Sequence, residues 1–167
     1  IEFGCGNGRD SLYFNAKGID VVAIDGSHIA IENLQKQNQK ASWICADFTA
    51  PLNLKDKFDI CYSRFTLHAI DDIAELGLIK NVKNLLKPSG LFVVEARSIN
   101  DDKFGVGKAV GEREFISDGH YRRFIDPDIF KSNLIANGFK VISIEQSNQF
   151  APTPGQNCVC IRVIAKL

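Results

Sequence analysis

Short apolar runs alternate with amphipathic segments along most of the chain. The apolar runs predict buried strands at residues 19–24, 43–46, 58–62, 91–95, 139–145 and 159–165. Amphipathic spacing predicts helices at residues 9–17, 27 to about 39, 71–86 and 126–138. Strands that alternate with helices imply parallel pairing and right-handed crossovers. The pattern therefore predicts an α/β fold.

Capping residues mark the ends of the predicted helices. Gly18 closes the first helix, and Ser27 has the side chain of an N-cap for the second. Asp126 caps the last helix, with Pro127 at its first position and Gly138 at its end. In the helix at 71–86, the apolar residues that we expect on the buried face are Ile73, Leu76, Ile79 and Val82.

Two segments depart from this alternation. The stretch from Arg97 to Tyr121 is polar, contains glycines and has no convincing period, which predicts a long functional or mobile loop. The last two strands are separated by a Pro- and Gly-bearing loop rather than a crossover helix, so we expect them to pair antiparallel. Lys87-Pro88-Ser89-Gly90 predicts a turn before the strand at 91–95.

The composition is that of one globular domain. Of the residues, 45% are apolar and 24% are charged, and 20 Lys and Arg balance 20 Asp and Glu. A chain without net charge has no global field that attracts nucleic acid or an anionic membrane. There is no long apolar stretch for a membrane span and no export signal, so we expect a cytoplasmic protein.

The cysteines and the first residue add two expectations. Five cysteines without Cys-x-x-Cys spacing favour buried thiols over disulfides or zinc, and we predict no metal site. The chain contains no Met and opens on Ile1 inside a central strand. We therefore expect that residues 1–167 are one domain with a truncated N-terminus, from a longer chain with a possible fused upstream domain. The sequence leaves the oligomeric state open.

Candidate chemistry begins in the segment Glu2-Phe3-Gly4-Cys5-Gly6-Asn7-Gly8. A strand that ends in a glycine-rich turn and opens a helix brings backbone N–H groups and the positive helix end close to a ligand. The nicotinamide fingerprint needs glycine at position 9, where Arg9 stands. The carboxylate of Glu2 disfavours a pyrophosphate and suits a ligand that carries an ammonium group.

Two further acids follow strands at the same expected edge of the sheet. Asp25 is placed to accept both hydroxyls of a ribose, and Asp47 to accept a hydrogen bond from an adenine amino group. Either one alone is as well explained by a turn or a helix cap. Together with the glycine segment, they indicate a nucleoside ligand with a cationic tail.

With these residues, the sequence resembles the class I S-adenosylmethionine-dependent methyltransferases over essentially its whole length. The resemblance implies a Rossmann-like, doubly wound sheet of seven strands in the order 3-2-1-4-5-7-6, with strand 7 antiparallel. It implies S-adenosylmethionine as the cofactor and these cofactor-binding residues: Glu2, Gly4, Cys5, Gly6, Asp25, Gly26, Asp47, Phe48, Ser63 and Arg64. Residues 87–90 resemble the family's Lys-Pro-Gly-Gly turn, with Ser89 as a departure. Residues 65–68 and 119–124 resemble a small-molecule subgroup that includes tellurite-resistance and surface-polysaccharide methyltransferases.

Candidate catalytic and acceptor-binding residues lie at the same edge or in the long segment. His68, His120 and Tyr121 are the candidate catalytic groups, although helix packing for His68 and a solvated loop for His120 explain these histidines equally well. The candidate acceptor-binding residues are Arg97, Arg122 and Arg123. Ordinary ion pairs with nearby acids are the alternative for these arginines.

The predicted function is methyl transfer from S-adenosylmethionine to a small polar, possibly anionic acceptor, with O-methylation favoured over N-methylation. A module that binds the cofactor without catalysis is the alternative from another class, and a nicotinamide-dependent oxidoreductase is disfavoured by Arg9 and Glu2. Nucleic acid is disfavoured as a substrate because there is no basic stripe, and Ser63-Arg64-Phe65-Thr66 replaces an Asn/Asp-Pro-Pro-Tyr/Phe motif.

Overall fold

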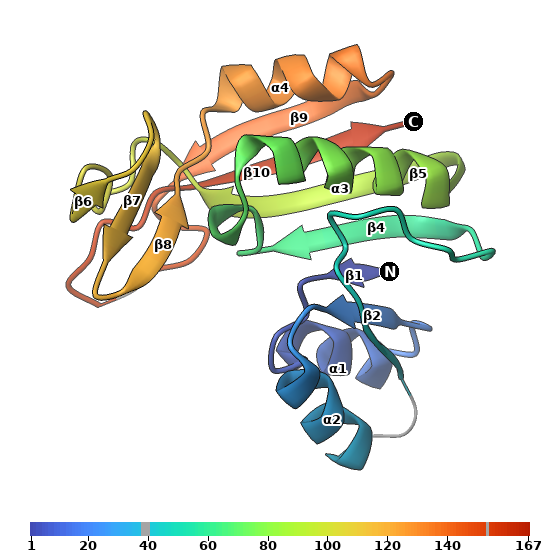
Figure 1. Cartoon of the computed structure of the whole chain (residues 1–167). Helices are drawn as coiled ribbons and strands as arrows, with labels where there is room; N and C mark the ends of the chain where they lie inside the picture. The colour runs from blue at the N-terminus through green and yellow to red at the C-terminus, as the bar shows by residue number, and fades with distance from the viewer. Residues whose placement is uncertain (38–40, 153) are drawn as a thin grey trace.

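The computed structural model of the chain shows a twisted sheet with helices on both faces (Figure 1). The structure describes residues 1–37, 41–152 and 154–167. Within these residues the large sheet has seven strands. In sheet order they are β3 (Ser42–Cys45), β2 (Val22–Asp25), β1 (Glu2–Phe3), β4 (Phe58–Arg64), β5 (Leu86–Arg97), β10 (Cys160–Lys166) and β9 (Lys140–Ser147).

The strand order confirms the predicted order 3-2-1-4-5-7-6. β1 to β5 pair in parallel, and β10 runs antiparallel to both β5 and β9. The helices are α1 (Arg9–Ala16), α2 (His28–Gln37), α3 (Asp72–Leu85) and α4 (Pro127–Ala136), with a 3₁₀ turn, η1, at Leu67–Ala69. In the described part of the chain, no helix has the length and apolar character needed to cross a membrane.

The predicted helix caps are confirmed. The Ser27 hydroxyl accepts the Ala30 N–H, and the Asp126 carboxylate accepts the N–H groups of Asp128 and Ile129. Gly138, at φ 93°, follows α4. The predicted end of the second helix near Gln39 lies outside the described residues.

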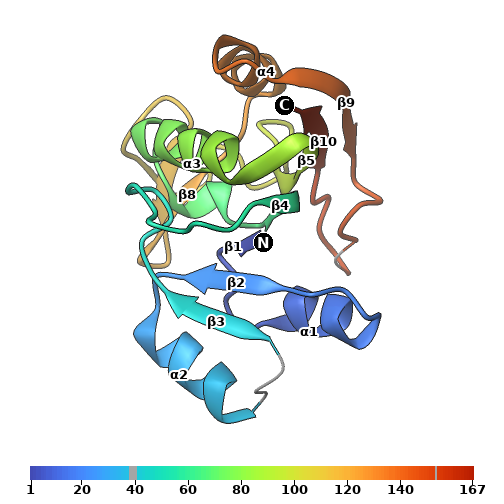
Figure 2. The ribbon, with the colours of Figure 1, turned by 90° about the vertical axis from the view of Figure 1, so that its right-hand side faces the viewer.

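Two hydrophobic clusters hold the layers together. Apolar residues of α1 and α2 pack with β2 and β3 around Ala23 and Trp43. Apolar residues of α3 and α4 pack with β4, β5 and β10 around Phe92 and Ile161. Figures 1 and 2 show α1 and α2 beside the β1–β3 end of the sheet, and α3 and α4 beside the β4–β9 end. This packing leaves the carboxyl ends of the parallel strands free for a site.

The prediction that Arg97–Tyr121 is one long loop is wrong. This part of the chain contains β6 (Lys108–Ala109) and β7 (Glu114–Ser117), which form a small antiparallel sheet with β8 (His120–Arg123). Asp118 and Gly119, at φ 53° and 75°, form the two-residue turn between β7 and β8. The small sheet stands beside η1 at the carboxyl edge of the large sheet (Figure 1).

The prediction for the buried face of α3 is half wrong. Ile79 and Val82 are buried, but Ile73 is 82% exposed and Leu76 lies at the surface. At about 100° per residue, a strict three-residue spacing drifts around the helix, so Ile73 and Val82 point in opposite directions. The residues of α3 that are buried are Glu75, Leu78, Ile79, Asn81, Val82 and Leu85.

Two smaller expectations need correction. Residues 87–90 belong to β5, where they form a bulge opposite β4 rather than a separate turn. Ser89 takes φ 67°, a conformation in which glycine is favoured, and the family's usual glycine fits there without strain. Of the five thiols, Cys45 is exposed, whereas the prediction expected buried cysteines.

Candidate active site

Two cavities open at the carboxyl ends of the parallel strands. The first, which we call the arginine cavity, has a volume of about 520 Å³ and is lined by residues that include Arg9, Arg64, Phe65, His68, Arg97, Arg122, Phe150 and Cys158. The second, which we call the aspartate cavity, has a volume of about 450 Å³ and is lined by residues that include Gly26, Asp47, Phe48, Asp71, Glu114 and Tyr121. Both lie at the edge where ligands of doubly wound sheets bind.

The glycine turn connects β1 to α1. Gly4, Gly6 and Gly8 all have positive φ, at 74°, 52° and 74°. A Cβ at Gly6 would meet nothing within 4 Å, so the backbone there faces open space. This is the geometry that lets a ligand approach the main chain and the N-terminal end of α1.

Asp25 ends β2 beside the glycine turn. Its Oδ2 accepts the Gly6 N–H at 2.7 Å, and its Oδ1 accepts the Ser27 N–H at 2.8 Å. Each carboxylate oxygen keeps further acceptor capacity, because a carboxylate oxygen accepts more than one hydrogen bond. The two backbone amides therefore hold a half-exposed carboxylate in a fixed orientation next to the turn, as a ribose site requires.

Asp47 and Phe48 follow β3 and line the aspartate cavity. Thr49 donates to Asp47 Oδ1 through its N–H at 2.9 Å and its hydroxyl at 2.6 Å, and these hydrogen bonds lower the pKa of Asp47. Phe48 is buried, and its ring packs edge-on against Phe3. Asn81 of α3 donates to the Phe48 carbonyl at 2.8 Å and fixes this segment.

Glu2 does not face either cavity. The side chain is 4% exposed, and its carboxylate accepts a hydrogen bond from the Ser11 hydroxyl of α1. Burial raises the pKa of Glu2 to about 7. The structure therefore places this acid beneath the first turn of α1, rather than at the position where we expected it to meet a cofactor ammonium.

The other predicted cofactor residues divide between the cavities and the core. Gly26 lines the aspartate cavity and Arg64 lines the arginine cavity. Ser63 is fully buried, and its hydroxyl has no hydrogen-bond partner within residues 1–37, 41–152 and 154–167. Cys5 is also buried, and burial raises its thiol pKa to about 12. A ligand in the cavities can thus contact the backbone of Gly26 and the side chain of Arg64, whereas the side chains of Cys5 and Ser63 are buried.

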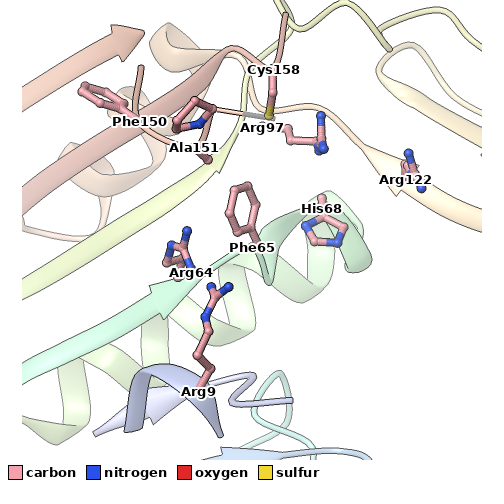
Figure 3. Close-up of a pocket in the computed structure, with 10 residues that line it drawn as sticks. Arg9, Arg64, Phe65, His68, Arg97, Arg122, Phe150, Ala151 and Cys158 are labelled. Carbon is pink, nitrogen blue, oxygen red and sulfur yellow. The ribbon is translucent and has the colours of Figure 1, made fainter. Parts of the chain in front are cut away.

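The arginine cavity has two cationic sides (Figure 3). Arg9, at the start of α1, and Arg64, at the end of β4, lie on one side of Phe65, and Arg97 and Arg122 lie on the other. The Arg64 guanidinium also stacks on the Phe65 ring, 4.8 Å from its centroid.

Acidic partners stand behind three of these arginines. Arg64 donates to Glu95 at 2.7 Å, and Arg97 donates to the buried Asp101 at 2.8 Å. Arg9 pairs with Asp10 at 3.1 Å. Across the described ranges, no acidic residue forms an ion pair with Arg122. The cavity wall is therefore cationic, and Arg122 carries the least neutralised charge in it.

His68, in η1, lies on the same side of Phe65 as Arg97 and Arg122 (Figure 3). Its Nδ1 is buried without a hydrogen-bond partner in the described part of the chain. Burial and the positive charges of Arg97 and Arg122 lower the pKa of His68 to about 4. The imidazole is neutral at neutral pH.

The other two candidate catalytic groups do not reach this cavity. Tyr121 lines the aspartate cavity, where burial and the charge of Glu114 raise its pKa to about 12. His120 is exposed at the turn end of β8 and lines neither cavity. The structure therefore brings His68 alone of the three to the arginine side.

Arg123 is buried and lines neither cavity, in contrast to the prediction that it binds the acceptor. It is 1% exposed and donates to Glu75 at 2.6 Å, to Asp72 and to the Leu67 carbonyl. Asn133 of α4 completes the group by donating to Glu75 at 2.9 Å. Arg123 therefore joins β8 to α3, which fixes its neighbours Tyr121 and Arg122 at the two cavities.

Several lining residues were not predicted from the sequence: Arg9, Phe65 and Phe150. Arg9 stands where the nicotinamide fingerprint has glycine, and its place in the first turn after the glycine segment brings it to the arginine cavity. Phe65 takes φ 53°, which the sequence does not signal. Phe150 arrives from the loop before β10, and the sequence carries no pattern that brings this loop to the cavity.

Comparisons with known proteins agree with this geometry. Residues 1–94 match the family described as a methyltransferase domain. Over 106 residues the chain is 28% identical to the probable S-adenosyl-L-methionine-dependent methyltransferase TehB of Haemophilus influenzae, in an alignment covering 61% of this chain and 37% of TehB. The chain thus spans well under half the length of that relative.

Two solved structures share the fold. A S-adenosylmethionine-dependent methyltransferase from Methanosarcina mazei superposes with a TM-score of 0.87 at 19% identity, over 99% of this chain and 90% of that one. The glycopeptide N-methyltransferase MtfA, complexed with S-adenosylmethionine, superposes with a TM-score of 0.75 at 18% identity, over 98% of this chain and 84% of that one. Because the family match covers more than half of the chain, the protein belongs to the methyltransferase domain family, as its resemblance to the class I S-adenosylmethionine-dependent methyltransferases predicts.

Proposed function

We propose that this domain transfers a methyl group from S-adenosylmethionine to a small, anionic acceptor, and to an oxygen atom rather than a nitrogen. The observation that carries the acceptor class is the arginine cavity, which has four arginines in its wall and no acid lining it among the described residues. Guanidinium groups bind carboxylate and phosphate through paired hydrogen bonds.

The residues present fit the cofactor. Gly6 offers open backbone at the turn, and the fixed carboxylate of Asp25 suits the two ribose hydroxyls. Asp47 and Phe48 line the aspartate cavity, where a purine would find a hydrogen-bond acceptor and an apolar wall. Arg9 and Arg64, on the side of the arginine cavity nearest the glycine turn, suit the carboxylate of the methionine part.

When bound, the cofactor supplies an activated methyl group on a sulfonium. The protein's task is then to hold the acceptor in line with that methyl group and to keep water out. Arg97 and Arg122 are placed to orient an anionic acceptor, and Phe65 and Phe150 supply apolar surface beside it. The volume of the arginine cavity, about 520 Å³, suits a small-molecule acceptor.

The test is a turnover assay with purified protein, labelled S-adenosylmethionine and a panel of small carboxylates, phosphates, phenols and amines. We expect S-adenosylhomocysteine to form with anionic acceptors, and Asp25→Ala to abolish its formation. Tight cofactor binding without turnover on any member of the panel would support the non-catalytic alternative. Turnover confined to amines would overturn the assignment of an oxygen acceptor.

A further inference from the structure

The arginine cavity has a cationic wall, no lining acid among the described residues, and one imidazole, that of His68, whose protonation this wall opposes. We infer that its acceptor reacts through a carboxylate that Arg97 and Arg122 hold, and that the product is a methyl ester formed without a general base from the protein. This inference rests on the proposed function and adds to it the chemical class of the reacting group.

Three other candidate bases lie outside the arginine cavity. His120 is exposed and lines neither cavity, and Tyr121 lines the aspartate cavity. Glu114 also lines the aspartate cavity. None of these three groups lines the cavity in which Arg97 and Arg122 lie.

Among the described residues, the titratable groups that line the arginine cavity besides the arginines are His68 and Cys158. His68 lies on the same side of Phe65 as Arg97 and Arg122, and its burial and both cations oppose its protonation. Cys158 is buried, and burial raises the pKa of its thiol. The nearby carboxylates of Glu95 and Asp101 lie behind the wall in ion pairs with arginines. An acceptor with a proton to lose therefore finds no suitable base.

The cationic wall of the arginine cavity favours an acceptor that is already deprotonated and negatively charged. Arg122 has no ion-pair partner among the described residues, and Arg97 uses one guanidinium nitrogen for Asp101, which leaves its other nitrogens for a ligand. A carboxylate is ionised at neutral pH and matches the planar guanidinium geometry. A phenol or an ammonium group would have to lose a proton to a base before it reacts. It would also bind the two guanidinium groups less strongly than a carboxylate does.

The reaction then balances without a proton transfer. A lone pair of the carboxylate oxygen forms the O–CH₃ bond, the C–S bond breaks, and its electron pair stays on sulfur. The negative charge of the carboxylate and the positive charge of the sulfonium cancel, so the reacting groups become a neutral methyl ester and a neutral thioether. The neutral ester is held less well by the two arginines than the carboxylate, which assists its release.

The experiment is a product analysis coupled to a binding measurement. Purified protein is incubated with methyl-labelled S-adenosylmethionine and benzoate, phenylacetate, malonate or glutarate, each beside its neutral amide and a phenol of similar size. Alkali hydrolyses methyl esters to volatile methanol, whereas methyl ethers and methylamines survive. Binding of each acid and its amide is measured by calorimetry with S-adenosylhomocysteine present.

We expect labelled methanol from at least one acid, and tighter binding of that acid than of its amide. Arg122→Gln should lower both kcat/KM and acid affinity about 10- to 100-fold, because a charged hydrogen bond to the ligand is lost. Lys108→Gln is the matched control, since Lys108 is an exposed cation of the same small sheet and lines neither cavity.

Two results would overturn the inference while leaving methyl transfer intact: a labelled product that resists alkali, or acids that bind no better than their amides. A complete lack of turnover combined with no cofactor binding would instead reject the proposed function itself. Turnover in a His68→Gln variant that stays near the wild-type rate supports the inference, and its loss with retained acid binding contradicts it, because His68 would then act as a base.

Discussion

Arg123 donates from its Nη2 to Glu75 Oε2 at 2.6 Å, and both side chains are almost completely buried. The pair connects β8 of the small sheet to α3, which packs on the large sheet. Tyr121 and Arg122, in the same strand as Arg123, line the two cavities, so the buried pair anchors the strand that carries them. An arginine that the sequence suggests as a ligand is thus a positioning residue for the site.

Arg123→Met should destabilise the protein by about 3–5 kcal/mol, because it leaves the buried carboxylate of Glu75 without its counter-charge. Arg113→Met is the matched control, since Arg113 pairs at 2.8 Å with Asp72, a side chain that is 49% exposed, and should lose about 1 kcal/mol or less. Urea unfolding followed by circular dichroism measures both. Equal losses for the two variants would contradict the structural role of Arg123.

Gly6→Ala should weaken S-adenosylmethionine binding more than it lowers stability. Gly6 has φ 52° and faces open space, so the added methyl group strains the backbone and enters the volume assigned to the ligand. Gly18→Ala shares the positive φ, at 81°, and the open surroundings, but lies outside the site. Thermal unfolding should show a similar loss of about 1–2 kcal/mol for both variants. Calorimetry should show weaker S-adenosylmethionine binding for Gly6→Ala alone. An equal loss of affinity in Gly18→Ala would argue against the glycine turn as the element that binds the cofactor.

Glu2 should make the protein less stable as the pH rises. Its pKa is about 7 in the folded protein and 4.5 ordinarily, so the folded state binds more protons than the unfolded state between these values. Its contribution to stability therefore falls between about pH 4.5 and 7 and stays low above that. Glu2→Gln should raise Tm at pH 8 relative to the wild type and change it little at pH 4. A lower Tm for the variant at pH 8 would show that the carboxylate is needed in its charged form.

His68 should titrate with a midpoint of about 4 in proton NMR, well below the ordinary value of 6.5. The chain has 3 histidines, so the His68 signal is assigned by its loss in His68→Gln. Since Arg122 is one cause of the lowered pKa, Arg122→Gln should move the midpoint upward. A wild-type midpoint near 6.5 would place the imidazole in water and away from the two guanidinium groups.

The seven-stranded order was predicted from the resemblance to the methyltransferase family, whereas the alternation of apolar runs and helices predicted the parallel strands themselves. Asp25, Asp47 and the glycines follow strands whose carboxyl ends meet at one edge, and the structure places Asp25 beside the glycine turn, with Asp47 lining the cavity on that edge. The helix caps at Ser27 and Asp126 are hydrogen bonds between residues two or three positions apart, so the local sequence predicts them.

The small sheet and the contents of the arginine cavity were harder to predict. β7 and β8 are short and rich in charge, so they lack an apolar period, although Asp118-Gly119 is the turn signal that could have revealed their hairpin. Whether an arginine binds a ligand or a buried acid depends on which acid folds against it. For Arg123 that acid, Glu75, lies 48 residues away along the chain. No local pattern specifies such a pair.

Cofactor binding at Asp25 is the basis of the proposed function, and calorimetric titration of S-adenosylmethionine tests it directly. The wild-type protein should bind the cofactor, and Asp25→Ala should lose at least about 100-fold in affinity, because two hydrogen bonds to a charged acceptor are removed. Asp56→Ala, at an exposed aspartate outside both cavities, should bind as the wild type does. Unchanged affinity in Asp25→Ala, or no binding by the wild type, would contradict the account.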